Sequence, residues 1–318
     1  MVLSVVICAF TTRRWEMLQS AVQSVVEQKP APYETIVVID HCGELEEAAI
    51  GVFPPMGVRV VTNEGMRGLS GARNTGVTHA RGDVIVFLDD DAVAAPGWLA
   101  AHAKHYANPD VLGVGGRVIA DWEDRAPAWF PTEFGWVVGC SYLGQPTTVS
   151  PVRNPIGANM SFRRPVISSV GGFSQSLGRV GATPMGCEET ELSIRATAAY
   201  PSGSILHDPR SSVRHRVPAS RGTWSYFRRR CWEEGRSKAR VTGLARTSAV
   251  LSSERVYVRK TLAQGVRRNL AEAQRERSWE AVLRASAICV GLAITTAGYG
   301  AGQLSRSLRG DEGLVRTG

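Results

Sequence analysis

The chain has 318 residues, of which 43% are hydrophobic and 21% charged, and its formal net charge is +8. This composition is ordinary for a soluble globular protein with one large domain, or with a domain and an appendage. The opening residues, MVLSVVICAF, contain neither a basic n-region nor a cleavage site, which argues against a secreted protein. Six scattered cysteines without a CxxC pair indicate reduced thiols in a cytoplasmic protein.

Apolar and helical segments alternate over the first hundred residues. Continuous apolar runs predict strands at residues 3–10, 34–40, 58–63 and 83–91. Helical spacing and turn signals predict helices at residues 15–25, 44–53 and 69–80, and a further helix that opens at Pro96. This alternation predicts an α/β fold with a mostly parallel sheet, in which ligands bind outside the carboxyl ends of the strands.

Polar and acidic residues follow the predicted strands and should meet along that ligand-binding rim. The strand ends are Ala9-Phe10-Thr11, Asp40-His41, Asn63-Glu64 and Asp89-Asp90-Asp91. Three adjacent carboxylates repel one another, and a divalent cation with oxygen ligands would offset this repulsion. A turn with an Asp helix cap is the alternative. No GxGxxG follows the first strand and no GxxxxGK[ST] occurs, which argues against a Rossmann dinucleotide site and a P-loop.

The remaining chain is less regular. We expect strands at residues 111–120 and 154–164, long loops between 121 and 153, and a helix from residue 186 with acidic residues in its first turn. The segment from Arg210 to Arg240 contains ten Lys or Arg and two Glu, a difference of 10 − 2 = +8. It indicates either an anionic partner or a solvated basic face.

The tail from residue 252 onward reads as mostly helical. Its uncharged stretch, residues 285–304, has about the length that spans a bilayer. It is only weakly hydrophobic, because it contains four glycines, three Ser or Thr residues and one Gln. We therefore favour a helix packed on the domain, or one lying on a membrane surface beside Arg306 and Arg309, over a transmembrane helix.

Several motifs occur in an order that resembles the family 2 glycosyltransferases. These are CAFTTRR, GLSGARNTG, RGDVIVFLDDDA, IGANMSFRR, GGF and GCEETEL. The resemblance covers residues 1–240. It implies the GT-A fold, a Rossmann-like and mostly parallel nucleotide-diphospho-sugar transferase sheet flanked by helices. Residues 241–318 would then form a helical C-terminal extension, with membrane association as one interpretation.

The resemblance implies a donor site along the rim. Phe10 matches an aromatic residue that stacks on the base, Asp40 an aspartate that hydrogen-bonds the base, and Arg73 a residue near the nucleotide. Asp89 matches the first position of the D-x-D motif, near the ribose and the metal. The other positions expected at the nucleotide are Ala9, Thr11, Arg13 and Asp90. A strand-end turn residue is the alternative for Asp40, and a surface helix charge for Arg73.

The resemblance also implies a metal site and a catalytic base. Asp91 would ligate Mg²⁺ or Mn²⁺, and His215 in VRHRV would complete the metal shell, unless it is a structural histidine. The family usually places the catalytic aspartate where this chain has Glu189. Glu191 is the rival base, and a first turn charged for dipole reasons is the alternative for both.

Other residues are candidates around the diphosphate and the acceptor. The arginines that could line the diphosphate are Arg214, Arg216, Arg221 and Arg228 to Arg230. The acceptor-side candidates are Trp129, Trp136 and Asn159, with core packing or loop structure as the better interpretation of either Trp. The sequence RRRCW breaks the Q-x-x-R-W signature of processive synthases, which predicts one transfer per encounter.

The expected protein is a metal-dependent, inverting glycosyltransferase with a nucleotide-diphosphate sugar as donor, most simply a UDP-sugar. Its acceptor would be the hydroxyl of a glycan, a lipid-linked molecule or a small molecule. We expect a cytoplasmic location, at the inner face of the membrane if the tail makes a peripheral contact. A sugar-phosphate nucleotidyltransferase is one alternative, although CAFTTRR lacks the required glycines. A basic nucleic-acid-binding protein is another, but no recognition motif supports a nucleic-acid partner.

Overall fold

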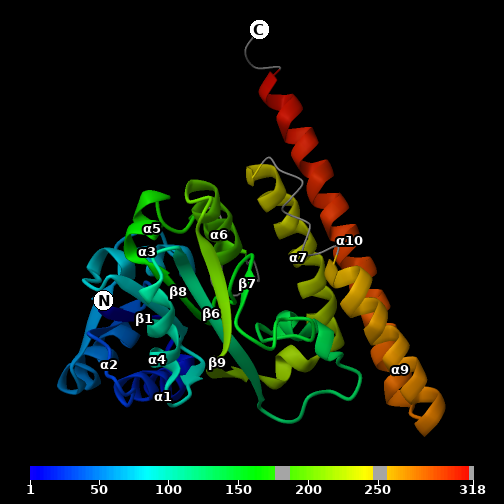
Figure 1. The fold of residues 1–318 in the computed structure, drawn as a ribbon, viewed down its shortest axis with the longest axis horizontal. Helices are drawn as coiled ribbons and strands as arrows, with labels where there is room; N and C mark the ends of the chain where they lie inside the picture. The colour runs from blue at the N-terminus through cyan, green and yellow to red at the C-terminus, as the bar shows by residue number, and fades with distance from the viewer. Residues whose placement is uncertain (176–186, 246–255, 315–318) are drawn as a thin grey trace.

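The computed structural model describes residues 1–175, 187–245 and 256–314, except for the side chains of 243–245 and 306–314. Within these residues, nine strands form one mixed sheet in the order β3-β2-β1-β4-β8-β6-β9-β5, with β7 paired to β9 (Figure 1). The strands are β1 Leu3–Ala9, β2 Glu34–Ile39, β3 Val58–Thr62, β4 Val84–Asp89, β5 Ala92–Ala94, β6 Val111–Trp122, β7 Ser150–Val152, β8 Asn159–Arg163 and β9 Ser204–Val217. The first four are parallel to one another, as the alternating pattern predicted.

Helices cover both faces of the sheet and extend beyond it. The α-helices are α1 Trp15–Val26, α2 Gly43–Val52, α3 Leu69–His79, α4 Trp98–Ala103, α5 Arg164–Ser169, α6 Glu188–Ala199, α7 Trp224–Ala245, α9 Ala263–Glu276 and α10 Trp279–Leu314. The short helices include η1 Thr12–Arg14, η4 Thr132–Val138, η5 Ala219–Gly222 and the π-helix η7 Tyr257–Leu262. The long helices α7, α9 and α10 lie together at one end of the molecule (Figure 1).

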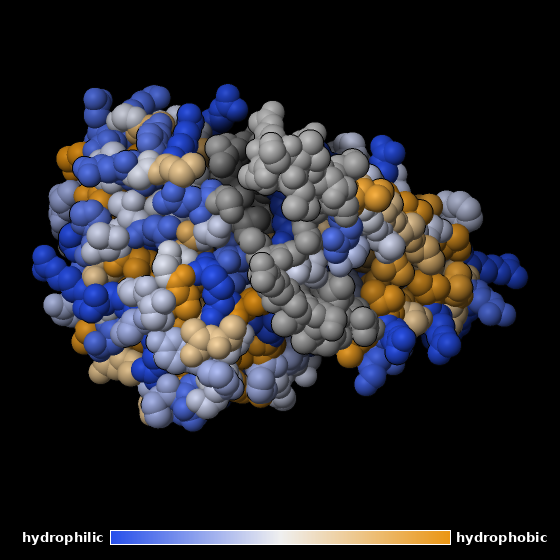
Figure 2. Space-filling view, turned by 90° about the horizontal axis from the view of Figure 1, so that it is seen from above, coloured by the Kyte–Doolittle hydropathy of each residue, from blue (hydrophilic) through white to orange (hydrophobic). Residues whose placement is uncertain are grey.

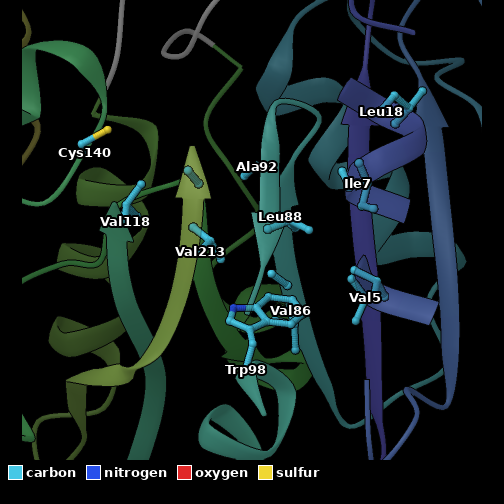
Figure 3. Close-up of a cluster of buried hydrophobic side chains, with 14 of the residues drawn as sticks. Val5, Ile7, Leu18, Val86, Leu88, Ala92, Trp98, Val118, Cys140 and Val213 are labelled. Carbon is cyan, nitrogen blue, oxygen red and sulfur yellow. The ribbon is translucent and has the colours of Figure 1, made fainter. Parts of the chain in front are cut away.

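Two hydrophobic cores flank the parallel strands because successive side chains of a strand point to opposite faces. Val5 and Ile7 of β1 belong to one core, which also contains Leu18 of α1 and Trp98 of α4 (Figure 3). Val6 belongs to the second core, on the side of α3, α5 and α6. Both faces of β1 are therefore buried, which accounts for its unbroken apolar sequence.

The structure differs from the sequence-based expectations in several places. Pro96 does not open a helix: α4 begins at Trp98, after Gly97 in a left-handed conformation with φ of 78°. Strand β9 and helix α7 were not predicted. The expected boundary between residues 240 and 241 falls inside α7. The expected loops between 121 and 153 contain the short elements η4 and β7. The side chains of Arg306 and Arg309 lie outside the described residues.

Helix α10 packs closely along α7 and α9, and its glycines make this possible. A Cβ atom on Gly298 would lie 2.4 Å from the carbonyl oxygen of Trp232 in α7. A Cβ atom on Gly291 would lie 2.6 Å from the ring of Phe134, whereas one on Gly300 would meet nothing within 4 Å. By length and composition alone, Trp279–Ser305 could cross a membrane, and 33% of its most apolar window is buried in the protein.

Replacing Gly298 with Ala should destabilise the protein, and Gly300→Ala on the same helix is the matched control. Each substitution gains helix propensity of up to about 1 kcal/mol relative to glycine. Only the first forces a side chain against the backbone of α7, which costs about 1–3 kcal/mol when packing is this tight. We expect a lower urea unfolding midpoint for Gly298→Ala than for Gly300→Ala. Equal midpoints would contradict close packing of α10 on α7.

Candidate active site

The carboxyl ends of β1, β2 and β4 open into a cavity of about 720 Å³. This donor-side cavity has a volume typical of small-molecule sites. Of the expected nucleotide-binding residues, all but Arg73 line it: Ala9, Phe10, Thr11, Arg13, Asp40, Asp89 and Asp90. Asp91 also lines it, whereas His215 lies behind Asp91 and lines a second cavity. Three of the four predicted strand ends thus line one cavity, whereas Asn63 and Glu64 after β3 do not line it.

Asp40 is held rigidly at the end of β2. Its Oδ1 accepts a hydrogen bond of 2.6 Å from the side-chain amide of Asn63, which follows β3. Its Oδ2 accepts a bond of 2.9 Å from the backbone N–H of Gly68, just before α3. His41, with a positive φ of 52°, turns the chain away from the strand. These contacts fix the carboxylate of a buried residue while it still lines the cavity.

The acidic turn after β4 is completed by β9. Strand β5 begins one residue after Asp91 and pairs antiparallel with β9, which places Ala92 opposite His215. As a result, Nε2 of His215 lies 3.1 Å from Oδ1 of Asp91. One ligand atom each from Asp89, Asp91 and His215 lie within 4.8 Å of one another. Two carboxylates and an imidazole suit a divalent cation such as Mn²⁺ or Mg²⁺, so the residues fit the expected metal site.

Basic side chains neutralise the acidic turn from two further directions. The Arg14 guanidinium in η1 lies 2.8 Å from Asp90 and 3.0 Å from Asp91. Arg221 in η5 lies 3.8 Å from Asp91. Burial, and then the charge of Asp91, raise the pKa of Asp90 to about 7. Although burial alone would raise the pKa of Asp91, the charge of His215 and its hydrogen bond hold that pKa well below its usual value.

His215 shares the strong coupling to Asp91. Burial alone would lower the pKa of the imidazole, but the charge of Asp91 and the hydrogen bond to it raise the pKa to about 10. Cys140 Sγ lies 3.7 Å from Nδ1 on the other side of the ring. With Asp91 as the partner of its Nε2 and no metal ion there, the imidazole is therefore cationic at neutral pH.

Arg73 links the acidic turn to helix α6. Its fully buried guanidinium lies 3.3 Å from Asp89 and 2.9 Å from Glu188, and it donates to the carbonyl oxygen of Gly157 at 3.2 Å. It also lies over the rings of two phenylalanines, with a distance of 5.5 Å to the nearer ring, that of Phe173. Arg73 lines the second cavity and not the donor-side cavity, so its expected nucleotide contact stays a prediction.

The second cavity has a volume of about 1110 Å³ and shares Asp89 and Leu69 with the donor-side cavity. We call it the acceptor-side cavity. Glu188 and Glu189 line it at the start of α6, after Cys187 in a left-handed conformation with φ of 78°. Residues of η7 and α10 form its far wall, including Tyr257, Thr295 and Tyr299.

The two rival base residues differ in their surroundings. Burial, and then the neighbouring charge of Glu188, raise the pKa of Glu189 to about 8. Glu191 instead makes two hydrogen bonds of 2.5 Å to the guanidinium of Arg195, and it does not line either cavity. The geometry therefore favours Glu189 over Glu191 as a group that meets a ligand.

Only some of the residues predicted to contact the acceptor or the diphosphate line either cavity. Asn159 is wrong as an acceptor contact, because it is fully buried and hydrogen-bonded to Trp98 and to two backbone carbonyl oxygens. Trp129 packs against Trp224 and Phe227, whereas Trp136 lines the acceptor-side cavity. Of the basic segment, Arg221 and Arg229 line the donor-side cavity and Arg230 the acceptor-side cavity. Neither cavity is lined by Arg214, Arg216 or Arg228.

Sequence reasoning missed Arg14 as an individual residue. It named the segment CAFTTRR and the adjacent Arg13, but only the short helix η1 decides which guanidinium reaches the aspartates. It also missed Tyr226 and Ser225, which line the donor-side cavity from α7. The only signal in the sequence for Tyr226 and Ser225 was their position inside the basic segment from Arg210 to Arg240.

Comparison with known proteins places the chain in a class. A mannosyltransferase from Pyrobaculum calidifontis, solved with GDP-Man and Mn²⁺, has a TM-score of 0.58 at 17% identity and covers 96% of this chain and 86% of its own. GalNAc-T7, solved with UDP, GalNAc and Mn²⁺, has a TM-score of 0.51 at 21% identity, over 68% of this chain and 43% of its own. The chain has the GT-A fold of these transferases.

The sequence comparisons define the family. The model of glycosyl transferase family 2 matches residues 4–171. A glucosyl-dolichyl phosphate glucuronosyltransferase from Haloferax volcanii is 33% identical over 240 residues, which is 75% of this chain and 76% of the relative. YwdF, an uncharacterized glycosyltransferase from Bacillus subtilis, is 30% identical over 131 residues, or 41% of this chain and 47% of the relative. The chain belongs to glycosyltransferase family 2 and is a glycosyltransferase.

Mn²⁺ binding by this protein should strengthen as pH rises, because a metal-ligating imidazole must be neutral. With the pKa of His215 raised to about 10, binding displaces a proton throughout the neutral range. We expect the apparent affinity to rise by about tenfold per pH unit between about pH 6.5 and 8.5. Calorimetric titration of the protein with Mn²⁺ measures this slope. His215→Ala should weaken binding and flatten the slope, whereas the control His79→Ala, at an exposed position of α3, should leave both unchanged. An unchanged slope in His215→Ala would contradict the assignment.

Proposed function

We propose that this glycosyltransferase moves one sugar per encounter from a nucleotide-diphosphate donor, most simply a UDP-sugar, to an acceptor hydroxyl with inversion at the anomeric carbon. The observation that carries the proposal is the junction of the two cavities at Asp89. The acidic turn lies on one side of this junction, and Glu189 lies on the other. Groups on opposite sides of a reacting carbon suit a displacement in which the nucleophile enters opposite the leaving group.

The donor would occupy the donor-side cavity. Phe10 is 36% exposed at the end of β1, and its ring is available to stack on a base, while Asp40 offers a fixed acceptor for a base N–H. Arg221 and Arg229 provide cationic groups for the diphosphate. Asp89, Asp91 and His215 would hold Mg²⁺ or Mn²⁺. When bound, the ion supplies positive charge that stabilises the departing nucleoside diphosphate.

The chain's own residues would divide the remaining work. Arg14 and Arg221 hold the carboxylates of the acidic turn in place, and Arg73 fixes Glu188 beside the base. Glu189, as a carboxylate, would accept the proton of the acceptor hydroxyl. The hydroxyl oxygen then forms the new bond to the anomeric carbon, and the old bond electrons leave with the diphosphate. A raised pKa near 8 makes Glu189 a stronger base than an ordinary carboxylate.

We further propose that the acceptor is lipid-linked and that the enzyme works in the cytoplasm at the inner face of the membrane. The Haloferax relative, named for a glucosyl-dolichyl phosphate substrate, supports this acceptor class. The mixed lining of the acceptor-side cavity also suits such a molecule, since it contains hydroxyl side chains and the apolar Leu262 and Leu292. Family membership argues against both the nucleotidyltransferase and the nucleic-acid-binding alternatives.

Glu189→Gln should lower the turnover number by about 10³-fold, because a general base contributes about 10²–10⁴-fold. Donor binding should persist, since Glu189 does not line the donor-side cavity. The measurement is release of nucleoside diphosphate across a donor panel with a dolichyl-phosphate-linked sugar as acceptor, beside calorimetric binding of the nucleoside diphosphate. Glu191→Gln, two residues further along α6, is the matched variant, and the folded variant should keep most of the turnover. Full activity in Glu189→Gln would exclude this residue as the base.

The pH profile offers an independent test of the base. Because the carboxylate form accepts the proton, the turnover number should rise about tenfold per pH unit up to the pKa of Glu189, about 8. Glu188→Gln removes the neighbouring negative charge, so it should move this rising limb to lower pH. The amide oxygen can still accept a hydrogen bond from Arg73. If the rising limb of the pH profile stayed at the same pH in Glu188→Gln, a group other than Glu189 would be responsible for it.

A further inference from the structure

The outward face of α10 is mostly apolar and covered by no described part of the chain. Besides Glu280, Cys289, Thr296 and Ser305, its exposed residues recur every three or four positions: Trp279, Leu283, Ser286, Val290, Ala293, Ala297, Gly300 and Leu304. We call this set the α10 stripe. It runs for about 38 Å along the helix at 1.5 Å per residue. Trp279 and Leu304, at its two ends, are 70% and 68% exposed.

An exposed apolar surface of this length marks an interaction site rather than ordinary surface. Figure 2 shows hydrophobic side chains gathered over the helical end of the molecule, with hydrophilic side chains at the rim of this area.

The opposite face of α10 is committed to the protein. Ala281, Ala285 and Ile288 are buried, and Gly298 packs against the backbone of α7. Arg284 donates to the side chain of Asn269 at 2.8 Å and forms an ion pair of 2.5 Å with Glu272, both in α9. Surrounding α10 with lipid would break these contacts and leave a cation in the hydrocarbon. A helix with one packed face and one apolar face suits the plane of a bilayer surface.

The charge around α10 identifies the kind of surface. Residues 256–305 contain seven Lys or Arg and three Glu, a difference of 7 − 3 = +4. Arg259, Lys260 and Arg267 are exposed on η7 and α9, beside α10. Exposed cations next to an apolar helix face complement anionic headgroups above an acyl layer.

We propose that the α10 stripe and the exposed cations of η7 and α9 dock the protein onto an anionic lipid bilayer, with α10 lying in the interface. Thr295 and Tyr299 on α10 line the acceptor-side cavity. Docking therefore brings one wall of that cavity to the membrane surface, where a lipid-linked acceptor resides. This last step rests on the proposed function, whereas the docking itself does not.

Vesicle co-sedimentation of the full chain tests the docking. The protein should bind phosphatidylcholine vesicles that contain phosphatidylglycerol about tenfold or more tightly than phosphatidylcholine alone, and added salt should weaken this binding. Leu283→Glu/Val290→Glu places two charges in the stripe at side chains that are each 38% exposed, and it should lose most of the binding. Ile50→Glu, at a 55% exposed position of α2, is the matched control and should bind like the parent.

A second readout covers the case in which the double variant fails to fold. Trp279 should shift its fluorescence to shorter wavelength on addition of anionic vesicles, and Trp279→Phe should lose that part of the signal. Glu189→Gln should dock normally, so a failed transfer reaction and a failed docking surface are distinguishable.

Four results would overturn the proposal. The first is a parent protein that fails to sediment with anionic vesicles, and the second is a folded double variant that sediments as well as the parent. The third is resistance to alkaline carbonate extraction from vesicles, which would indicate a spanning helix. The fourth is a parent that forms a dimer without binding vesicles while the double variant is a monomer, which would make the stripe an interface between two copies.

Discussion

The negative charge of three adjacent aspartates at the carboxyl end of β4 must be neutralised by cations from other parts of the chain. Each aspartate of the turn has a cation from a different part of the chain: Arg73 from α3 for Asp89, Arg14 from η1 for Asp90, and His215 from β9 for Asp91. Buried carboxylates this close would otherwise be protonated, because burial and mutual repulsion both raise their pKa. Neutralising the turn therefore ties three distant segments to one point.

Arg73 extends this arrangement to the second half of the site. Its guanidinium is shared between Asp89 and Glu188, so the acidic turn and the start of α6 are coupled through one buried cation. Glu188 is thereby held next to Glu189, whose pKa it helps to raise. A cation that binds one carboxylate thus positions a charge that acts on the pKa of the carboxylate beside it.

Sequence alone predicted the part of the fold that obeys a local pattern. Strands β1, β2 and β4 are buried on both faces, and their apolar runs and polar ends predicted residues that line the donor-side cavity. Strand β9 was missed because its inward positions include His207, Ser211 and His215, and because its register against β6 shifts after Asp208. The acceptor-side cavity was also out of reach. It forms only when η7 and α10 pack beside the catalytic domain, and no local pattern encodes that contact.

The glycines of α10 explain why its sequence was ambiguous. The glycines lower the mean hydropathy of the helix, which argues against a membrane-spanning segment. Gly291 and Gly298 instead allow close packing, since a side chain at either position would collide with the ring of Phe134 or the backbone of Trp232. The exposed residues of the stripe are mostly apolar, with Ser286 as its one hydroxyl side chain. Weak average hydrophobicity thus conceals two distinct faces, one packed on the protein and one exposed. Because the same helix walls the acceptor-side cavity, its packing on α7 sets how that cavity is presented to a surface outside the protein.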